Sequence, residues 1–126
     1  MAPGSKIRPP KRNNSRGTRV NAKLDAYLGN WMFEDFDLPP IIWSPTTSDY
    51  QARQVLEEFV KRNPEWWVEL AYDAKTDFPW CAWLRPREEG TKEYTPLASG
   101  YPLPLVLCRV VILALTNGEV EDWAWE

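Results

Sequence analysis

The chain has 126 residues, of which 44% are hydrophobic, including 8 Trp. This content suffices for one packed domain and excludes disorder along the whole chain. The formal net charge of −3 hides a division, because residues 1–23 hold seven basic side chains and no acidic one. The remainder has 8 basic against 18 acidic residues, a charge of −10, which disfavours nucleic-acid binding outside the basic segment.

The two cysteines, Cys81 and Cys108, lie in apolar runs without CxxC spacing, and the chain has no His. A zinc site and a Cys-His catalytic pair are therefore not expected, and we expect two reduced, buried thiols. The basic start is not followed by an apolar segment, so no signal peptide is predicted. These features predict a cytoplasmic protein with no membrane segment and no cofactor.

Residues 1–20 are rich in Pro, Gly, Ser, Asn, Lys and Arg and are predicted to be a disordered basic arm. Such an arm can attract nucleic acid by charge, but no aromatic residue lies among its charges to stack on bases. We therefore prefer a solubilising tail and keep a nucleic-acid tether as the alternative. The domain is predicted to span residues 21–118. An acidic tail with two Trp follows at 119–126, and the pattern leaves open whether it forms a strand.

Two helices are predicted before any strand. From Asn21, apolar residues recur at the three-four spacing of one helix face, and the pattern ends in the acidic and proline-containing segment 34–40. In the second helix, Ser48 with Gln51 predicts a capping box, an apolar stripe follows, and Pro64 ends the pattern.

The period of the pattern then changes to two, which is typical of strands. Three short strands are predicted at residues 65–73, 78–84 and 92–97, paired antiparallel as a meander. Adjacent residues of a strand point to opposite faces, so Trp66 and Trp67 must lie on opposite sides of the sheet.

The segment 101–115, YPLPLVLCRVVILAL, is the most apolar part of the chain. Prolines at its start and Asn117-Gly118 after it predict a helix, and a helix apolar almost all round must be buried on more than one side. It is too short to span a bilayer and carries a central Arg109. The order helix, helix, three strands, helix predicts an α+β fold. We expect a three-stranded, mainly antiparallel sheet covered by three helices in a sandwich-like arrangement, on one face or on both.

Four segments of the chain resemble the phage ABA sandwich domain family of small phage and prophage accessory proteins. They are Lys23–Leu28 with its Leu-Asp pair, Ser44–Tyr50 with its Thr-x-Asp motif, Trp66–Leu70, and Pro104–Arg109. The resemblance covers about residues 23–116. It implies a three-layer sandwich around the sheet and an accessory role in the cytoplasm of a bacterial host cell. A looser resemblance is to phage proteins that counter Thoeris defence by sequestering cyclic nucleotide signals, from which no ligand residue is carried over.

Arg109 is one candidate binding residue. Within a helix with apolar neighbours, its charge must be paired with a carboxylate, reach the rim of the core, or face an anionic ligand. A structural ion pair with Asp25, Asp49 or a strand Glu is the preferred interpretation, and anion binding is the alternative.

Aromatic and basic residues of the strands form the second candidate site. If helices cover only one face of the sheet, exposed aromatic side chains on the other face indicate a binding site or a subunit interface. Trp67, Trp80 or Trp83, with Arg85 or Arg87, could stack on a nucleotide base and hold its phosphate. The same residues could hold a homodimer together, and a sheet covered on both faces would need no ligand.

The sequence contains no glycine-rich phosphate loop, nucleophile elbow or metal-ligand spacing. Carboxylate pairs such as Glu57-Glu58 and Glu88-Glu89 are interpreted as solvated, and a hydrolase would require two acids meeting in one cleft. We therefore expect a non-enzymatic, self-associating phage protein that binds a small anionic nucleotide signal or a host protein. The alternative is a nucleic-acid-associated protein that uses its basic arm.

Overall fold

The computed structural model describes residues 21–33 and 42–120, so the predicted basic arm and most of the acidic tail lie outside the described residues. The elements are α1 (Ala22–Met32), α2 (Asp49–Arg62), β1 (Trp66–Tyr72), β2 (Trp80–Pro86), β3 (Leu97–Gly100) and α3 (Leu103–Thr116). The strands form one antiparallel sheet in the order β1-β2-β3. The predicted α+β class and its element order are confirmed.

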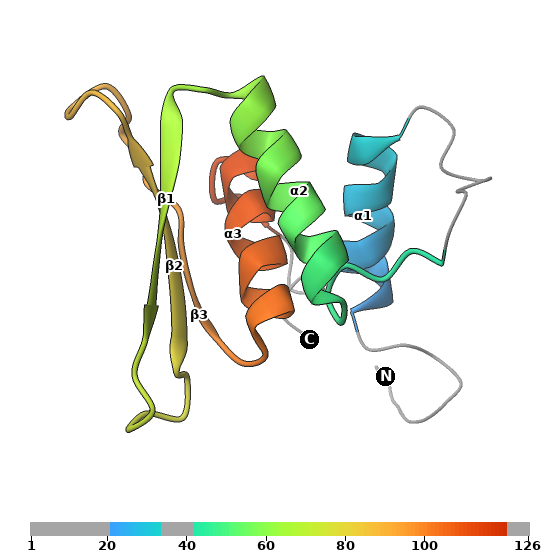
Figure 1. Ribbon diagram of the computed structural model, residues 1–126. Helices are drawn as coiled ribbons and strands as arrows, with labels where there is room; N and C mark the ends of the chain where they lie inside the picture. The colour runs from blue at the N-terminus through green and yellow to red at the C-terminus, as the bar shows by residue number, and fades with distance from the viewer. Residues whose placement is uncertain (1–20, 34–41, 121–126) are drawn as a thin grey trace.

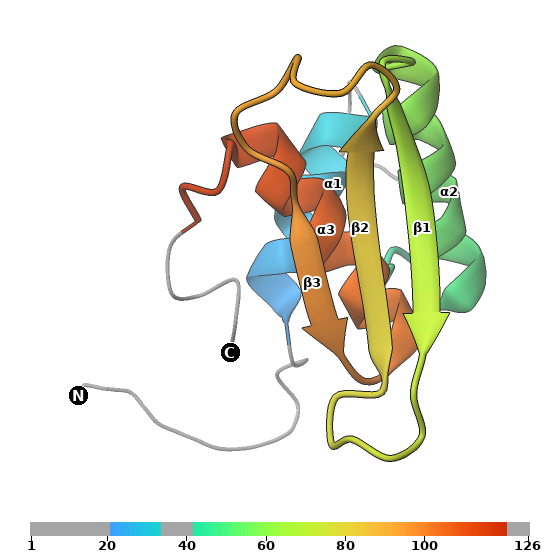
Figure 2. The same cartoon turned by 90° about the vertical axis from the view of Figure 1, so that its left-hand side faces the viewer.

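The sheet forms one outer layer of the described part of the molecule (Figure 1). Helices α2 and α3 pack against each other, α3 contacts β2 and β3, and α1 lies on the far side of this helix pair (Figure 1), so that all of these helices stand behind the sheet in Figure 2. Within the described ranges, all helices therefore cover the same face of the sheet. The layers run sheet, helix pair, helix, whereas the family resemblance implies helices around the sheet.

Helix α3 is the centre of the core. Its residues 104–108 and 110–113 are buried, and only Arg109 interrupts this run. The helix is enclosed because it contacts the sheet on one side and α1 and α2 on another. Burial of apolar surface stabilises the fold by about 25 cal/mol per Å², so α3 contributes a large share of the stability.

The C-terminal end of α3 follows the predicted signal. Asn117 adopts a left-handed conformation with φ 55°, and the Gly118 N–H donates to the Leu113 carbonyl at 2.8 Å. Gly118 itself has φ +81°, and a Cβ there would lie 3.0 Å from the ring of Tyr94. Glycine is therefore required both by the backbone conformation and by the close approach of this ring.

The start of α2 confirms half of the predicted capping box. The Ser48 hydroxyl accepts from the Gln51 N–H at 3.2 Å. A capping box also predicts a bond from the Gln51 side chain back to the Ser48 N–H. This part of the prediction is wrong, because the Gln51 carboxamide bonds to residues 42–48, the connector that precedes α2. Its oxygen accepts from the Ser44 N–H and its nitrogen donates to the Ile42 carbonyl, both at 2.6 Å. Gln51 thus holds the connector on α2.

Two prolines displace the predicted strands. The predicted strand at 92–97 is wrong, because β3 begins only at Leu97, directly after Pro96, which has no N–H to offer a ladder. Pro96 contributes only its carbonyl, which accepts from the Leu84 N–H at 3.0 Å. In the same way, β2 begins after Pro79 and not at residue 78.

Buried polar bonds attach α1 to the connector. Asp25 is fully buried, and its carboxylate accepts from the N–H and the hydroxyl of Thr46 at 3.0 and 3.1 Å. The backbone carbonyl of Asp25 accepts from the indole N–H of Trp43 at 2.8 Å. These bonds satisfy groups that would otherwise be costly to bury, and they fix α1 relative to residues 43–46.

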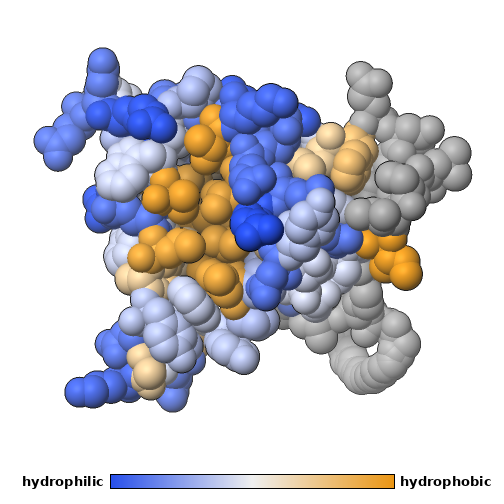
Figure 3. Space-filling view, viewed as in Figure 1, coloured by the Kyte–Doolittle hydropathy of each residue, from blue (hydrophilic) through white to orange (hydrophobic). Residues whose placement is uncertain are grey.

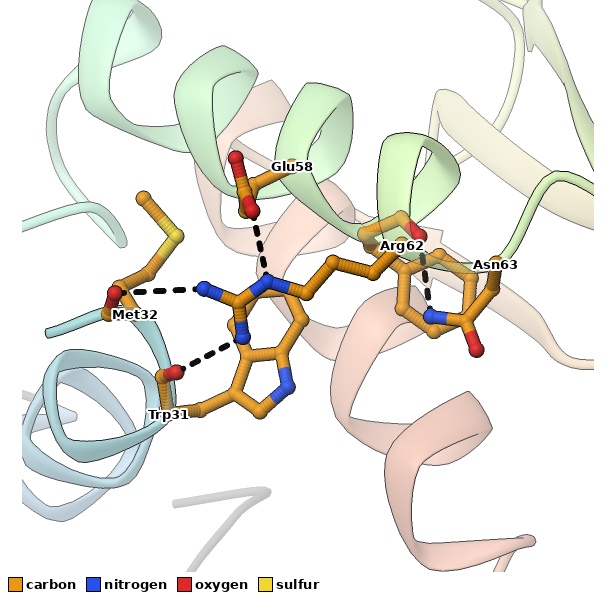
Figure 4. A network of polar contacts seen from close by, with 6 residues as sticks. Trp31, Met32, Glu58, Arg62 and Asn63 are labelled. Carbon is orange, nitrogen blue, oxygen red and sulfur yellow. Dashed lines mark hydrogen bonds and ion pairs between the residues drawn. The ribbon is translucent and has the colours of Figure 1, made fainter. Parts of the chain in front are cut away.

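Arg62 attaches the other end of α1 to α2 (Figure 4). Its Nε donates to Glu58 at 2.6 Å, and its terminal nitrogens donate to the carbonyls of Trp31 and Met32 at 3.1 and 3.4 Å. The guanidinium also lies 4.5 Å from the centroid of the Trp31 ring. The last carbonyls of a helix lack partners within it, so Arg62 caps α1 from outside.

We expect Asp25→Ala to lower the free energy of unfolding by about 1–3 kcal/mol, because two buried donors of Thr46 would lose their acceptor. Urea denaturation followed by circular dichroism measures this change. Asp49→Ala, at an exposed position in the first turn of α2, serves as the control and should cost no more than about 0.5 kcal/mol. Equal stability of the Asp25 variant and the wild type would contradict the structural role of this carboxylate.

Candidate binding surface

The sheet face opposite the helices, here called the outer face, is defined by the strand register. It carries Trp67, Glu69, Ala71, Cys81, Trp83, Arg85, Leu97 and Ser99. Trp67 is 39% and Leu97 48% exposed, and Trp83 is half-buried. Trp83 lies between Glu69 and Leu97 across the three strands. The structure therefore brings the predicted residues Trp67, Trp83 and Arg85 together on one open surface.

Arg85 is engaged in an ion pair on this surface. Its Nε donates to the carboxylate of Glu69, and its guanidinium carbon lies 5.6 Å from the centroid of the Trp83 ring. The carboxylate offsets the positive charge that a phosphate would need. The outer face is therefore an apolar surface with a neutral pair at its centre rather than an anion site.

The other predicted binding residues lie elsewhere. Trp80 is on the helix side of the sheet, where its ring centroid is 4.7 Å from that of Tyr72. Arg87 follows β2 and donates its Nε to the Pro64 carbonyl at 2.9 Å. Arg109 is half-buried in α3, where desolvation lowers the pKa of its guanidinium. The predicted set is thus divided between separate parts of the fold.

Two exposed leucines of the sheet were not predicted as binding residues. Leu70 is 47% exposed although the alternation of β1 places it on the helix side. Leu97 is 48% exposed at the start of β3. The alternation of apolar and polar residues shows to which face of the sheet a side chain points, but it does not show whether the strand lies at the border of the sheet. For Leu97, the preceding Pro96 indicates that the strand begins there and lies at the border of the sheet.

A cavity of about 570 Å³ lies where the C-terminal ends of α2 and α3 meet the β2–β3 connection. Trp66 and Tyr94 are among the residues that line it, and burial raises the pKa of Tyr94. Two acids, Glu65 and Glu93, line this cavity, and both are exposed. Lys92 lies 3.4 Å from the Glu65 carboxylate and 5.4 Å from the Trp66 ring centroid. The exposure of both acids and the pairing of Glu65 with Lys92 disfavour acid–base chemistry at this place.

No group of three or more His, Cys, Asp or Glu side chains within residues 21–33 and 42–120 could hold a metal ion. The helices of the same ranges are all too short or too polar to cross a membrane. Comparisons of the chain with protein-family models, with curated proteins and with solved structures find no match.

We expect the two thiols to differ in reactivity. Cys108 is fully buried in α3, as predicted, and desolvation together with the charge of Asp25 raises its pKa. Cys81 is only half-buried and lies on the outer face. Because the thiolate is the reactive form, a maleimide should label Cys81 in the native protein and leave Cys108 unlabelled from about pH 7 to 9.

Peptide mapping by mass spectrometry identifies the labelled thiol. In a Cys81→Ser variant, Cys108 should react only after unfolding in urea, because its burial in α3 excludes the reagent and its raised pKa disfavours the reactive thiolate. Rapid labelling of Cys108 in the folded variant would contradict the enclosure of α3.

Proposed function

We propose that the protein is a non-enzymatic binding protein whose outer face docks on a partner protein. The observation that carries this proposal is that every helix of the described residues covers the same side of the sheet (Figure 2), which leaves Trp67, Trp83 and Leu97 on the open side. Neighbouring apolar side chains exposed in this way mark interaction sites. Tryptophan is also enriched among the residues that contribute most to protein–protein affinity.

The charges favour a protein with a basic rim over a phosphate-bearing ligand at this surface. Glu69 offsets the charge of Arg85, and residues 65–100 hold seven acidic against four basic side chains. A partner with an apolar centre and Lys or Arg at its margin would complement both features and associate faster. In the setting that the family resemblance suggests, the chain is a phage accessory protein and this partner is a bacterial host protein.

The test is capture from a bacterial extract on immobilised protein, followed by mass spectrometry and a titration with the purified partner. We expect Trp67→Ala to weaken binding on the order of 30-fold, the effect of losing an interface tryptophan that contributes strongly to affinity. Tyr50→Ala is the matched control, because this aromatic residue is 62% exposed on α2 and lies away from the outer face. It should leave the affinity unchanged.

Partner binding should also slow the labelling of Cys81, because this thiol lies on the same surface. A folded Trp67→Ala variant that keeps the full affinity, with Cys81 still accessible in the complex, would refute the proposal. Circular dichroism of each variant establishes that it is folded before binding is compared.

A small nucleotide is a second candidate ligand, and the cavity is the observation that favours it. Its volume falls within the range of about 300–1,000 Å³ that is usual for ligand pockets. The half-buried side chain of Tyr94 lines the cavity and offers a ring on which a base can stack, and the Lys92 ammonium can reach a phosphate. The carboxylates of Glu65 and Glu93 oppose the phosphate, so we rank this function below protein binding.

Nucleotide binding would quench tryptophan fluorescence during a titration. We expect Lys92→Glu to lower the affinity for the nucleotide about tenfold through the loss of a charged contact. Lys75→Glu, in the exposed β1–β2 turn, should leave this affinity unchanged. If calorimetry detects no nucleotide binding to the wild type, this second candidate fails and the first is untouched.

A further inference from the structure

The two borders of the sheet differ in how they are protected. Strand β3 has only 4 residues and lies between Pro96 and Pro102. Strand β1 has 7 residues, no Pro, Gly or Lys, and a single charged side chain, Glu69. Its register with β2 is continuous from end to end, without a bulge. Proteins usually shield an open strand with shortness, proline, lysine or a bulge, and β1 has none of these.

The backbone of β1 directs alternate polar groups to this open border. The Glu65 carbonyl accepts from the Arg87 N–H, and the Asp73 N–H donates to the Pro79 carbonyl, both at 2.8 Å. The backbone N–H and C=O groups of the odd-numbered residues therefore point toward β2, because the direction of these groups alternates from one residue to the next along an antiparallel strand. The backbone N–H and C=O groups of the even-numbered residues point away from β2. In the middle and at the end of β1 these residues are Val68, Leu70 and Tyr72.

The same residues place apolar side chains beside the border. Leu70 is 47% and Tyr72 56% exposed, both on the helix side of the sheet. Figure 3 shows hydrophobic surface in the strip between β1 and α2. Trp67 adds an exposed aromatic ring on the outer side. Along β1, backbone donors and acceptors that point away from β2 thus lie beside exposed apolar side chains. Borders to which another strand is added have the same combination.

We propose that β1 pairs antiparallel with β1 of a second copy of the chain, with Leu70 opposite Leu70 on a two-fold axis. In this register Val68 faces Tyr72 of the other copy, and each such pair exchanges both backbone hydrogen bonds. Glu69 faces Ala71, so no like charges are opposed. An axis at Glu69 would place two carboxylates directly opposite each other, which is unfavourable.

A second copy suits this border because the border is neutral. Arg85 offsets the only charge on β1, whereas the chain beyond residue 23 carries −10. Two copies therefore repel least where they meet through β1, and their exposed Leu70 and Tyr72 side chains cover one another. This inference does not depend on the proposed function, since Leu70 lies on the side of the sheet opposite the outer face.

The chain offers a matched pair of leucines for the test. Leu70 and Leu97 are 47% and 48% exposed and lie on the two border strands. We expect the full chain to sediment as a dimer within a concentration range of about 1–100 µM, and Leu70→Lys to sediment as a monomer. Lysine at this position opposes its own copy across the axis. Leu97→Lys should remain a dimer.

Amide hydrogen exchange supplies a second readout. The N–H groups of Val68, Leu70 and Tyr72 should exchange more slowly in the wild type than in Leu70→Lys, since pairing gives each an acceptor. A wild type that is monomeric throughout the range, or a Leu70→Lys variant that stays dimeric, would overturn the inference. If Leu97→Lys no longer binds the outer-face partner while Leu70→Lys still binds it, partner binding and dimerisation through β1 are independent, and each can fail without the other.

Discussion

The arrangement of this fold follows from one constraint, the burial of a helix that is apolar around nearly its whole circumference. A helix of this kind cannot lie at a surface, so α3 needs a layer on each side. The sheet provides one layer and the other helices provide the second. Placing all helices of the described part on one side meets this need, and it leaves the opposite sheet face without cover. The exposed tryptophans are therefore a consequence of how the core is built.

Much of the fold could be predicted because its signals are local. The three-four spacing of α2, the alternation of β1 and the apolar run of α3 each identify an element from neighbouring residues. The exceptions arise where a group has a distant partner. Gln51 was expected to bond within its own helix start, but it bonds to the connector. The third strand begins at Leu97 and not at residue 92 as predicted, because the nitrogen of Pro96 has no hydrogen to donate to the neighbouring strand.

The candidate site was predictable only in part. Alternation correctly placed Trp66 and Trp67 on opposite sides of the sheet, but it could not show which face the helices would leave open. It also could not show that Glu69 would stand beside Arg85, because that pair depends on the register between two strands. The exposure of Leu70 depends on the position of β1 at the border. Each of these properties is set by tertiary structure and leaves no mark in a short stretch of sequence.

The unequal borders of the sheet also limit how far assembly can proceed. A sheet that accepts neighbours along both borders can add copies without end and form fibres. Here the short β3, placed between two prolines, offers almost no backbone for a further strand. Growth through β1 alone would close after one addition, so the molecule can carry a long apolar strand at its margin without becoming a unit of a filament.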